Sequence, residues 1–454
     1  MPVYGIQRIA DIHQKSYSMR SMKICWFYSP IIALLVCITN VNAQDWPQYL
    51  GPDRNSTSPQ QNILRSWPET GPEILWTVEV GLGNGGPIVK DGRIYFLDRN
   101  DSIGDMMRCF DLNTGEEFWN YGYDAPGTVR FPGTRSVPAI DGNYVYSCGH
   151  NGDLYCIDIN TQKPVWNNNI WTDFGGEEIP RWAIAQCPLI YNNLVILASQ
   201  TTEAGVVAFD KMTGDLKWAS PSFGREGYVS PAIVKVGEEE HVVMIGASRG
   251  RGEDQTGGKV VGMDPKTGKI LWEYTNWQCM IPAPSAYDAG DGKALIIGGY
   301  EAGAAMIQVE KNADGTYNVT ELYKNVDFGG HTKPPLYYDG YFYAQYSTNR
   351  RRDGLVCMSM DGELMWKTGR EPGFNKGSMI LADGLILATD GEKTLYLIEP
   401  DPSGFKPLAS ADVLEIVAVA EPRYGNQNWA PIALADGRLL IRDQSQIVCV
   451  KVAQ

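Results

Sequence analysis

The hydrophobic and polar positions of this chain repeat in short units, without the long 3.6-residue periodicity of helices. One unit occupies residues 109–119, where Cys109 is followed by Asp111, Thr114-Gly115 and a closing Trp119. Asp and Thr side chains accept hydrogen bonds from nearby backbone N–H groups, and Gly adopts the left-handed conformation of tight turns. The unit therefore predicts two strands joined by a hairpin turn. The same frame recurs at residues 156–166, 208–218 and 262–272 and, one residue shorter, at 357–366.

A second hairpin pattern precedes each unit and consists of two apolar runs around a turn of the Asp-Gly type. Its eight copies occupy residues 87–96, 138–146, 188–197, 231–244, 284–297, 335–344, 379–388 and 431–441. Each repeat therefore contains two hairpins, hence four strands, within roughly 43 to 54 residues, which is typical of propeller blades. One buried Trp per repeat indicates that each blade packs against the next.

Two incomplete repeats at the ends of this pattern complement each other. Residues 74–80 resemble a closing strand with its Trp76, but no first half precedes them, whereas residues 447–452 begin a unit that lacks its Trp strand. Pairing of the two would remove an open sheet edge. We therefore predict an all-β, eight-bladed β-propeller of four-stranded antiparallel blades, closed by the N-terminal strand in the C-terminal blade. An open solenoid, the alternative, would not leave matching half-repeats.

The first 43 residues have the pattern of a secretory signal peptide. Basic residues precede an apolar run at 24–36, and the small residues Val41 and Ala43 follow it. The run is shorter than the about 20 residues of a membrane-spanning helix, and Val36 precedes Cys37 where lipoprotein processing requires a smaller residue. We expect residues 1–43 to be a signal peptide, 44–73 an extended N-terminal arm and 74–454 the propeller. The mature protein would be periplasmic or extracellular, without a lipid anchor.

Charge and cysteine content bear on nucleic-acid binding, on disulfides and on structural metal sites. The formal net charge of −14 argues against a nucleic-acid partner. Seven cysteines follow residue 43, and four of them share one repeat position, which favours small buried residues over disulfides. Cys148 and Cys156 flank a hairpin and form the pair best placed for a disulfide. No Cys-x-x-Cys pattern supports a structural zinc site.

The small-x-Asp-x-x-Thr-Gly-x-x-x-Trp frame and the count of eight resemble the pyrroloquinoline-quinone (PQQ) repeat family of propellers. Residues 45–54 are also similar to the arm of many secreted bacterial proteins of this type. The resemblance covers nearly all of the chain after residue 43. It implies the fold, but it leaves the activity open, because the family contains quinoprotein dehydrogenases and non-enzymatic scaffolds such as BamB, an outer-membrane protein assembly protein.

The dehydrogenase alternative can be tested on residues that the resemblance implies. Family dehydrogenases hold PQQ between a Trp floor and a disulfide of adjacent cysteines, with calcium on Glu, Asn and Asp and an Asp base. This sequence has no adjacent cysteines, and its repeat tryptophans are expected between blades. Enzymatic activity is left uncertain, and we expect a non-catalytic scaffold without a cofactor. The alternative is a PQQ- and calcium-dependent quinoprotein oxidising alcohols or sugars.

The resemblance also implies that the loop entering each innermost strand borders the central channel. Residues of these loops suit an anionic or extended polar ligand, or a peptide strand, although they could instead fill the channel. His331 is more often a hydrogen-bonded loop residue than a base. A carbohydrate module, favoured by an aromatic pair near Trp182 and Trp429, is a third hypothesis. We expect a monomer that binds envelope proteins or an extended polar ligand through Asn84, Arg135, Arg181, Trp182, Tyr228, Gln278, His331, Asn375, Asn428 and Trp429.

Overall fold

A computed structural model describes residues 44–127, 133–250, 255–348, 351–415 and 427–454. The predicted signal peptide, residues 1–43, lies outside the described residues. The described part consists of strands joined by turns and loops, with one short 3₁₀ helix, η1 (Thr172–Phe174). None of its helices is long and apolar enough to cross a membrane.

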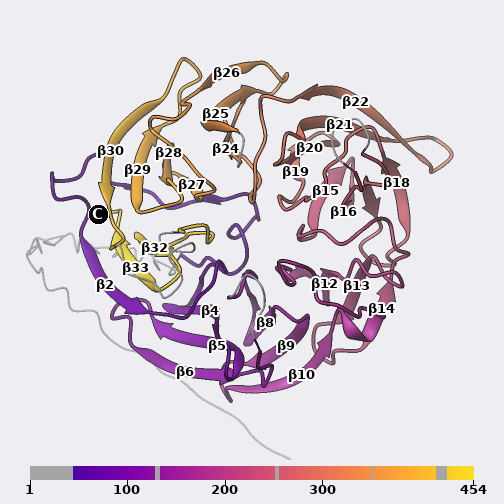
Figure 1. The fold of residues 1–454 in the computed structure, drawn as a ribbon, viewed down its shortest axis with the longest axis horizontal. Helices are drawn as coiled ribbons and strands as arrows, with labels where there is room; N and C mark the ends of the chain where they lie inside the picture. The colour runs from indigo at the N-terminus through magenta and orange to yellow at the C-terminus, as the bar shows by residue number, and fades with distance from the viewer. Residues whose placement is uncertain (1–43, 128–132, 251–254, 349–350, 416–426) are drawn as a thin grey trace, which may run out of the picture. The chain divides into compact units, whose positions relative to one another are not determined.

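Eight sheets surround a central channel, as Figure 1 shows, and each sheet is one blade of a β-propeller. Blade 1 contains β3 (Ile88–Lys90), β4 (Arg93–Asn100), β5 (Gly104–Asp111) and β6 (Glu117–Gly122). Blade 2 contains β7 (Ala139–Asp141), β8 (Tyr144–Cys148), β9 (Asp153–Asp158) and β10 (Lys163–Asn169). Blade 3 contains β11 (Leu189–Tyr191), β12 (Leu194–Ala198), β13 (Val206–Asp210) and β14 (Leu216–Ala219). Blade 4 contains β15 (Ala232–Val236), β16 (Glu239–Gly246), β17 (Lys259–Met263) and β18 (Ile270–Tyr274).

The second half of the ring repeats this arrangement. Blade 5 contains β19 (Tyr287–Gly290), β20 (Lys293–Gly298), β21 (Gly303–Lys311) and β22 (Tyr317–Asn325). Blade 6 contains β23 (Leu336–Tyr338), β24 (Tyr341–Ser347), β25 (Arg352–Ser359) and β26 (Leu364–Lys367). Blade 7 contains β27 (Met379–Ala382), β28 (Leu385–Thr389), β29 (Thr394–Glu399) and β30 (Lys406–Asp412), with β1 (Thr57–Ser58) added to β27. Blade 8 contains β31 (Ala433–Ala435), β32 (Arg438–Arg442), β33 (Gln446–Lys451) and β2 (Ile74–Glu79).

Blade 8 closes the ring as the sequence predicted. β2 pairs antiparallel with β33, and Trp76 lies opposite Cys449. The indole N–H of Trp76 donates a hydrogen bond to the Leu112 carbonyl of blade 1 at 3.0 Å. The N-terminal strand therefore completes the last blade and contacts the first one, which confirms the predicted eight-bladed propeller.

The repeated turn has the predicted hydrogen bonds. In blade 1, Asp111 Oδ1 accepts backbone N–H groups of Asn113 and Thr114, each at 2.8 Å. Gly115 adopts φ 73°, and a Cβ there would lie 2.8 Å from the Trp76 ring. Glycine is therefore required both by the turn and by the indole of the preceding blade. Gly214 under Trp166 and Gly268 under Trp218 repeat this inter-blade contact.

Two blades that depart from the repeat also differ in how their aromatic ring contacts the next blade. Gln162 replaces Gly in blade 2, and the indole N–H of the facing Trp119 has no hydrogen-bond partner. In blade 5, Tyr323 takes the Trp position and its ring packs over Gly362 of blade 6. The irregular repeats thus keep an aromatic contact without the indole hydrogen bond.

All seven described cysteines are buried thiols. Cys109, Cys156, Cys357 and Cys449 are 0% exposed, which supports the prediction of small buried residues. Cys148 and Cys156, the pair best placed for a disulfide in the sequence, are both free thiols. Cys148 lies opposite Leu154 and Cys156 lies opposite Tyr146, so the two thiols do not face each other across the hairpin.

The segment before β2 crosses the centre of the ring, where Figure 1 shows it in indigo. Its Pro47 carbonyl accepts the Ile140 N–H of blade 2, and Ser56 accepts the Leu381 N–H of blade 7. Between them, the Arg54 guanidinium donates to the carbonyls of Pro188 and Pro231, both at 3.1 Å. We call residues 46–58 the plug, because they join the inner edges of several blades across the channel.

Candidate functional site

A cavity of about 530 Å³ lies in the channel above the plug, and we call it the channel cavity. Tyr49 of the plug is part of its lining. The structure brings together seven of the ten residues proposed from the sequence. These seven are Asn84, Arg135, Arg181, Trp182, Tyr228, His331 and Trp429.

The other three proposed residues do not line the channel cavity. The Gln278 side chain instead bonds to both backbone groups of Gly258, at 2.9 and 2.7 Å. Asn375 donates its backbone N–H to Asp390, and Asn428 is fully buried. Gln278 thus has a local structural contact that accounts for its position.

Sequence reasoning missed several lining residues, chiefly Tyr49, Tyr300, Lys333 and Lys376. Lys333 stands two residues before Pro335, at the start of an inner strand, so its position in a mouth loop was readable from the repeat. Tyr49 could not be placed in the same way, because the plug has no repeat partner.

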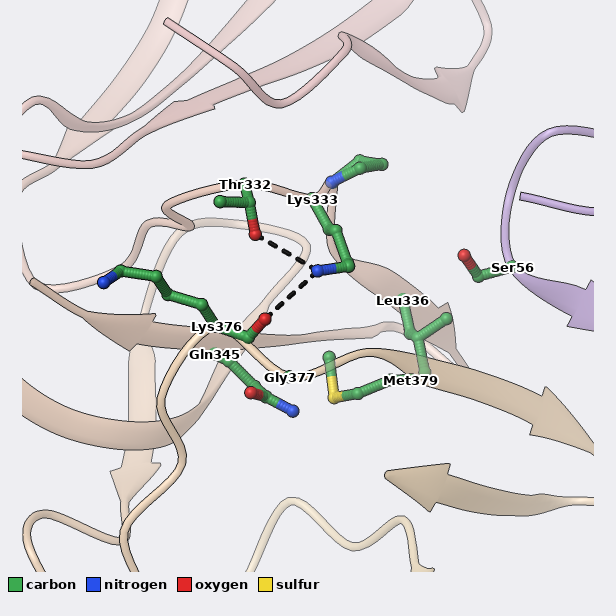
Figure 2. A pocket seen from close by; sticks show the side chains of 9 residues that line it. Ser56, Thr332, Lys333, Leu336, Gln345, Lys376, Gly377 and Met379 are labelled. Atoms are coloured by element: carbon green, nitrogen blue, oxygen red, sulfur yellow. Dashed lines mark hydrogen bonds between the residues drawn. The ribbon is translucent and has the colours of Figure 1, made fainter. Parts of the chain in front are cut away.

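One side of the cavity, contributed by blades 6 and 7, carries amines and an imidazole. We call His331, Lys333 and Lys376 the amine wall. Lys333 Nζ donates to Trp429 O at 2.7 Å, to Lys376 O at 3.1 Å and to Thr332 Oγ1 at 3.2 Å. Figure 2 shows this amine between Thr332 and the Lys376 carbonyl, while the Lys376 side chain extends away from it.

Burial and mutual repulsion lower the pKa of each group in the amine wall. Burial, followed by the Lys376 charge, lowers the pKa of Lys333 to about 7. Burial and nearby Arg352 lower the pKa of Lys376 to about 8. Burial and the two lysines lower the pKa of His331 to about 4, although its bond to the Ser347 carbonyl acts in the opposite direction. Near pH 7 the Lys376 amine is therefore mostly protonated, the Lys333 amine is about half protonated and the His331 imidazole is neutral.

No Asp or Glu is among the described residues that line the channel cavity. Arg181, Lys333 and Lys376 form no salt bridge with any carboxylate of the described residues. Buried and half-buried cations are ordinarily paired. A positive cavity in a chain of net charge −14 therefore favours a negatively charged occupant.

Aromatic rings border the same cavity. Trp182 and Tyr228 pack edge to face with ring centroids 5.5 Å apart, and the Arg181 guanidinium lies 5.2 Å from the Trp182 ring. Lys376 Nζ lies 4.1 Å from the centre of the Trp429 ring. Trp182 thus pairs with Tyr228, and the Lys376 amine lies over Trp429, so both tryptophans border the cavity.

The loops around the cavity contain strained backbone. Ala183, Tyr300 and Lys376 adopt φ values of 60°, 52° and 62°, in the left-handed region that non-glycine residues rarely occupy. Each such residue costs on the order of 1–3 kcal/mol and persists only where its surroundings enforce it. Strain at three loops around one cavity is typical of a binding site.

A smaller cavity of about 20 Å³ adjoins the amine wall, and Figure 2 shows its lining. Ser56 of the plug, Gln345 of β24 and Met379 of β27 contribute to it, together with Lys333. The buried Gln345 Oε1 has no hydrogen-bond partner within the described part of the chain. This space is about the size of one water molecule, so the channel cavity is the only one of the two that admits an organic ligand.

The repeats and the ring closure define an eight-bladed propeller whose repeats are similar to those of the PQQ-repeat propeller family. A family model described as outer membrane protein assembly factor BamB matches residues 104–278. The chain is 30% identical over 154 residues to the quinoprotein alcohol dehydrogenase PedH of Pseudomonas putida, covering 32% of this chain and 24% of that protein. It thus spans about a quarter of that relative's length.

Solved structures of both kinds share the fold. A quinohemoprotein alcohol dehydrogenase from Comamonas testosteroni superposes with a TM-score of 0.59 at 14% identity, over 90% of this chain and 81% of that one. BamB from Moraxella catarrhalis superposes with a TM-score of 0.54 at 13% identity, over 83% and 97%. At these identities the likeness shows the fold alone, so the function must be argued from the site.

The residues present do not fit the calcium-bound quinone centre that the family resemblance implies. The sequence lacks adjacent cysteines, and Tyr49 of the plug stands in the cavity lining. Calcium is held by several carboxylate and carbonyl oxygens, yet no carboxylate lines the described cavity. The described residues also contain no cluster of three His, Cys, Asp or Glu suited to a metal. The repeat tryptophans are used between blades.

Proposed function

We propose that this protein is an exported, non-catalytic binding propeller whose channel cavity captures a negatively charged ligand or an acidic segment of a cell-envelope partner. The observation that carries the proposal is a lining in which Arg181, Lys333 and Lys376 meet no carboxylate of the described residues. The ligand supplies the missing anion. The propeller supplies rigidity, since closed blades hold mouth loops at fixed positions.

The anion contacts a half-desolvated site, which strengthens the electrostatic attraction. Charges in an environment of low dielectric interact more strongly than at an open surface and are screened less by salt. Arg181, which is exposed at the mouth, attracts the ligand from solution. The strained loops hold the side chains before binding, so little ordering is required when the ligand enters.

Calorimetric titration of the purified protein with hexaglutamate and hexalysine tests the charge preference. We expect hexaglutamate to bind and hexalysine not to bind, with affinity falling as salt is raised. The double variant Arg135→Gln/Arg181→Gln should lower hexaglutamate affinity by about tenfold or more without lowering the melting temperature. Arg93→Gln/Lys217→Gln removes the same charge from exposed positions of blades 1 and 3 and should have little effect. Equal binding of the two peptides contradicts the proposal.

A quinoprotein dehydrogenase is the second candidate, favoured by the match to the P. putida alcohol dehydrogenase. Titration with PQQ and calcium, followed by dye reduction with alcohols and sugars, distinguishes it. Because the donor set does not fit that centre, we expect no turnover. Tight uptake of PQQ with turnover would overturn the non-catalytic assignment.

A further inference from the structure

The channel cavity has two chemically different sides. The amine wall comes from blades 6 and 7, whereas blades 3, 4 and 5 contribute a set of mostly small uncharged residues to the lining, in addition to Arg181 and three aromatic residues. We call the second set the small-residue wall, and it consists of Ala185, Cys187, Ser230, Ile281 and Ala283. In Figure 1, blade 7 lies across the ring from blade 3, whereas blade 5 is the neighbour of blade 6.

The small-residue wall reaches down to the plug. In blade 3, exposure falls from Arg181, which is exposed, to Cys187, which is 4% exposed. The next residue, Pro188, accepts a hydrogen bond from Arg54 of the plug. In blade 4, Ser230 is likewise 4% exposed, and the next residue, Pro231, accepts from Arg54. These two inner loops therefore run from a charged rim to an uncharged base.

Packing also fixes the small-residue wall. Cys187 donates its backbone N–H to Ser230 Oγ at 2.9 Å, and Ser285 Oγ donates to Ser230 O at 2.7 Å. Burial raises the pKa of the Cys187 thiol, so this group stays neutral. Tyr49, 6% exposed, adds a phenol at the plug end of the wall. A neutral surface with a few hydroxyl groups thus faces the amines across the cavity.

Lys333 has a structural counterpart on the other side that lacks its charge. Two residues before the inner-strand proline, blade 3 has Gln186 and blade 6 has Lys333. Both side chains donate to a backbone carbonyl of the following blade, Gln186 to Val229 at 2.9 Å and Lys333 to Lys376 at 3.1 Å. An amide therefore suffices for this contact between blades. The charge of Lys333 remains to be explained by something in the cavity.

We infer that the channel cavity binds a small amphipathic organic anion, with its acid group on the amine wall and its uncharged body on the small-residue wall. The inference rests on the proposed function and specifies its ligand. A cavity of about 530 Å³ has the size of ordinary small-molecule sites. Burying the uncharged body supplies affinity that an inorganic ion lacks. The amines select an acid over its neutral amide.

Titration calorimetry with four probes separates the contribution of the acid group to affinity from that of the uncharged body. The probes are 2-naphthoate, its neutral analogue 2-naphthamide, the cation 2-naphthylmethylammonium, and acetate, which has the charge without the body. We expect 2-naphthoate to bind at least about tenfold more tightly than 2-naphthamide and acetate, and the cation not to bind.

Two variants assign the effect to the two walls. Lys376→Met should weaken 2-naphthoate about tenfold and leave 2-naphthamide unchanged. Ala283→Phe should weaken both naphthyl probes and leave acetate unchanged, because it fills space without altering charge. Lys217→Met, on the exposed face of β14, is the matched control for charge removal. If Ala283→Phe does not fold, as judged by its melting curve, Ala185→Leu takes its place.

The outcomes distinguish this inference from the proposed function. If acetate or hexaglutamate binds as tightly as 2-naphthoate, the amphipathic ligand is wrong while anion capture stands. If 2-naphthamide equals 2-naphthoate, the amine wall does not select the acid and the inference is overturned. If none of the anions binds, both the inference and the proposed function are wrong.

Discussion

Two regions of the propeller use cations in opposite ways. At the seam between blades 8 and 1, Arg442 is 0% exposed and its guanidinium bonds to Asp98 Oδ1 at 3.0 Å. The same group donates to the carbonyls of Gly81, Gly85 and Leu97. At the channel cavity, Lys333 and Lys376 form no ion pair with a carboxylate of the described residues.

A second buried carboxylate lies near the seam between blades 1 and 2. Asp105 accepts a hydrogen bond from Arg99 of the neighbouring strand in blade 1 at 3.1 Å, and it lies 3.1 Å from His150 Nδ1 of blade 2. Arg442 is thus paired with a carboxylate at its seam, whereas Arg54 of the plug joins blades 3 and 4 through the carbonyls of Pro188 and Pro231, with no carboxylate partner among the described residues. Lys333 and Lys376 also lack a carboxylate, but unlike Arg54 they line the channel cavity, which is the reason for assigning their charge to ligand binding rather than to stability.

The largest expected effect comes from removing a cation at the seam. Arg442→Met leaves Asp98 with less of its compensating charge and abolishes four hydrogen bonds between blades, so the free energy of unfolding should fall by about 3–5 kcal/mol. Lys376→Met, the matched substitution in the channel cavity, should leave it unchanged or raise it, because a desolvated charge without a partner is removed. Urea unfolding followed by tryptophan fluorescence measures both. Similar losses for the two variants would remove the distinction between the regions.

A second prediction uses pH, since the amine wall contains amines whose folded pKa values lie below the unfolded value of 10.5. Between about pH 7 and pH 9 the unfolded chain binds more protons at these lysines than the folded chain does, so they make stability rise with pH. The gain for the pair from pH 6.5 to 8.5 should be about 2–3 kcal/mol. His331, whose pKa is lowered to about 4, is already neutral throughout this range.

Comparison with Lys333→Met/Lys376→Met isolates this contribution. The double variant should show a flatter dependence of the urea midpoint on pH than the unchanged protein. Lys217→Met, an exposed lysine of β14, should retain the original slope. Parallel profiles for all three proteins would mean that the two amines keep their ordinary pKa values in the folded state.

The difference between the repeated blades and the channel cavity explains which features the sequence could predict. The blades were readable because Asp111, Gly115 and Trp119 belong to a unit that recurs with fixed spacing, and each residue has a local or next-blade contact. The closure followed from complementary half-repeats and is confirmed by Trp76 opposite Cys449. These features depend on local hydrogen bonding and periodic burial, which a single sequence displays.

The cavity was less readable because it is made by loops that differ from blade to blade. The sequence placed Arg135 and Arg181 at the mouth but selected Asn375 instead of the adjacent Lys376. Side-chain direction in an irregular loop depends on backbone conformation, and Lys376 is left-handed there. The plug was missed as a cavity wall, because its contacts are with blades far away in sequence. Periodicity contains no information on either feature.

The smallest expected effect concerns backbone strain in the mouth loops. Most left-handed positions in the hairpin turns of the blades hold Gly, Asn or Asp, with Gln162 an exception, whereas the mouth has Ala183 at φ 60°. Ala183→Gly should relieve about 1–2 kcal/mol of backbone strain in the folded state. The larger conformational entropy of glycine in the unfolded chain opposes this gain by about 0.5–1 kcal/mol. Stability should therefore rise by less than about 1 kcal/mol, as measured by the urea midpoint. Gly214→Ala is the opposite test in the framework, because its Cβ would lie 2.7 Å from the Trp166 ring at φ 76°. Gly214→Ala should therefore lower the free energy of unfolding. If Ala183→Gly lowers it as well, the mouth loop depends on the Ala183 methyl group and does not tolerate strain for binding.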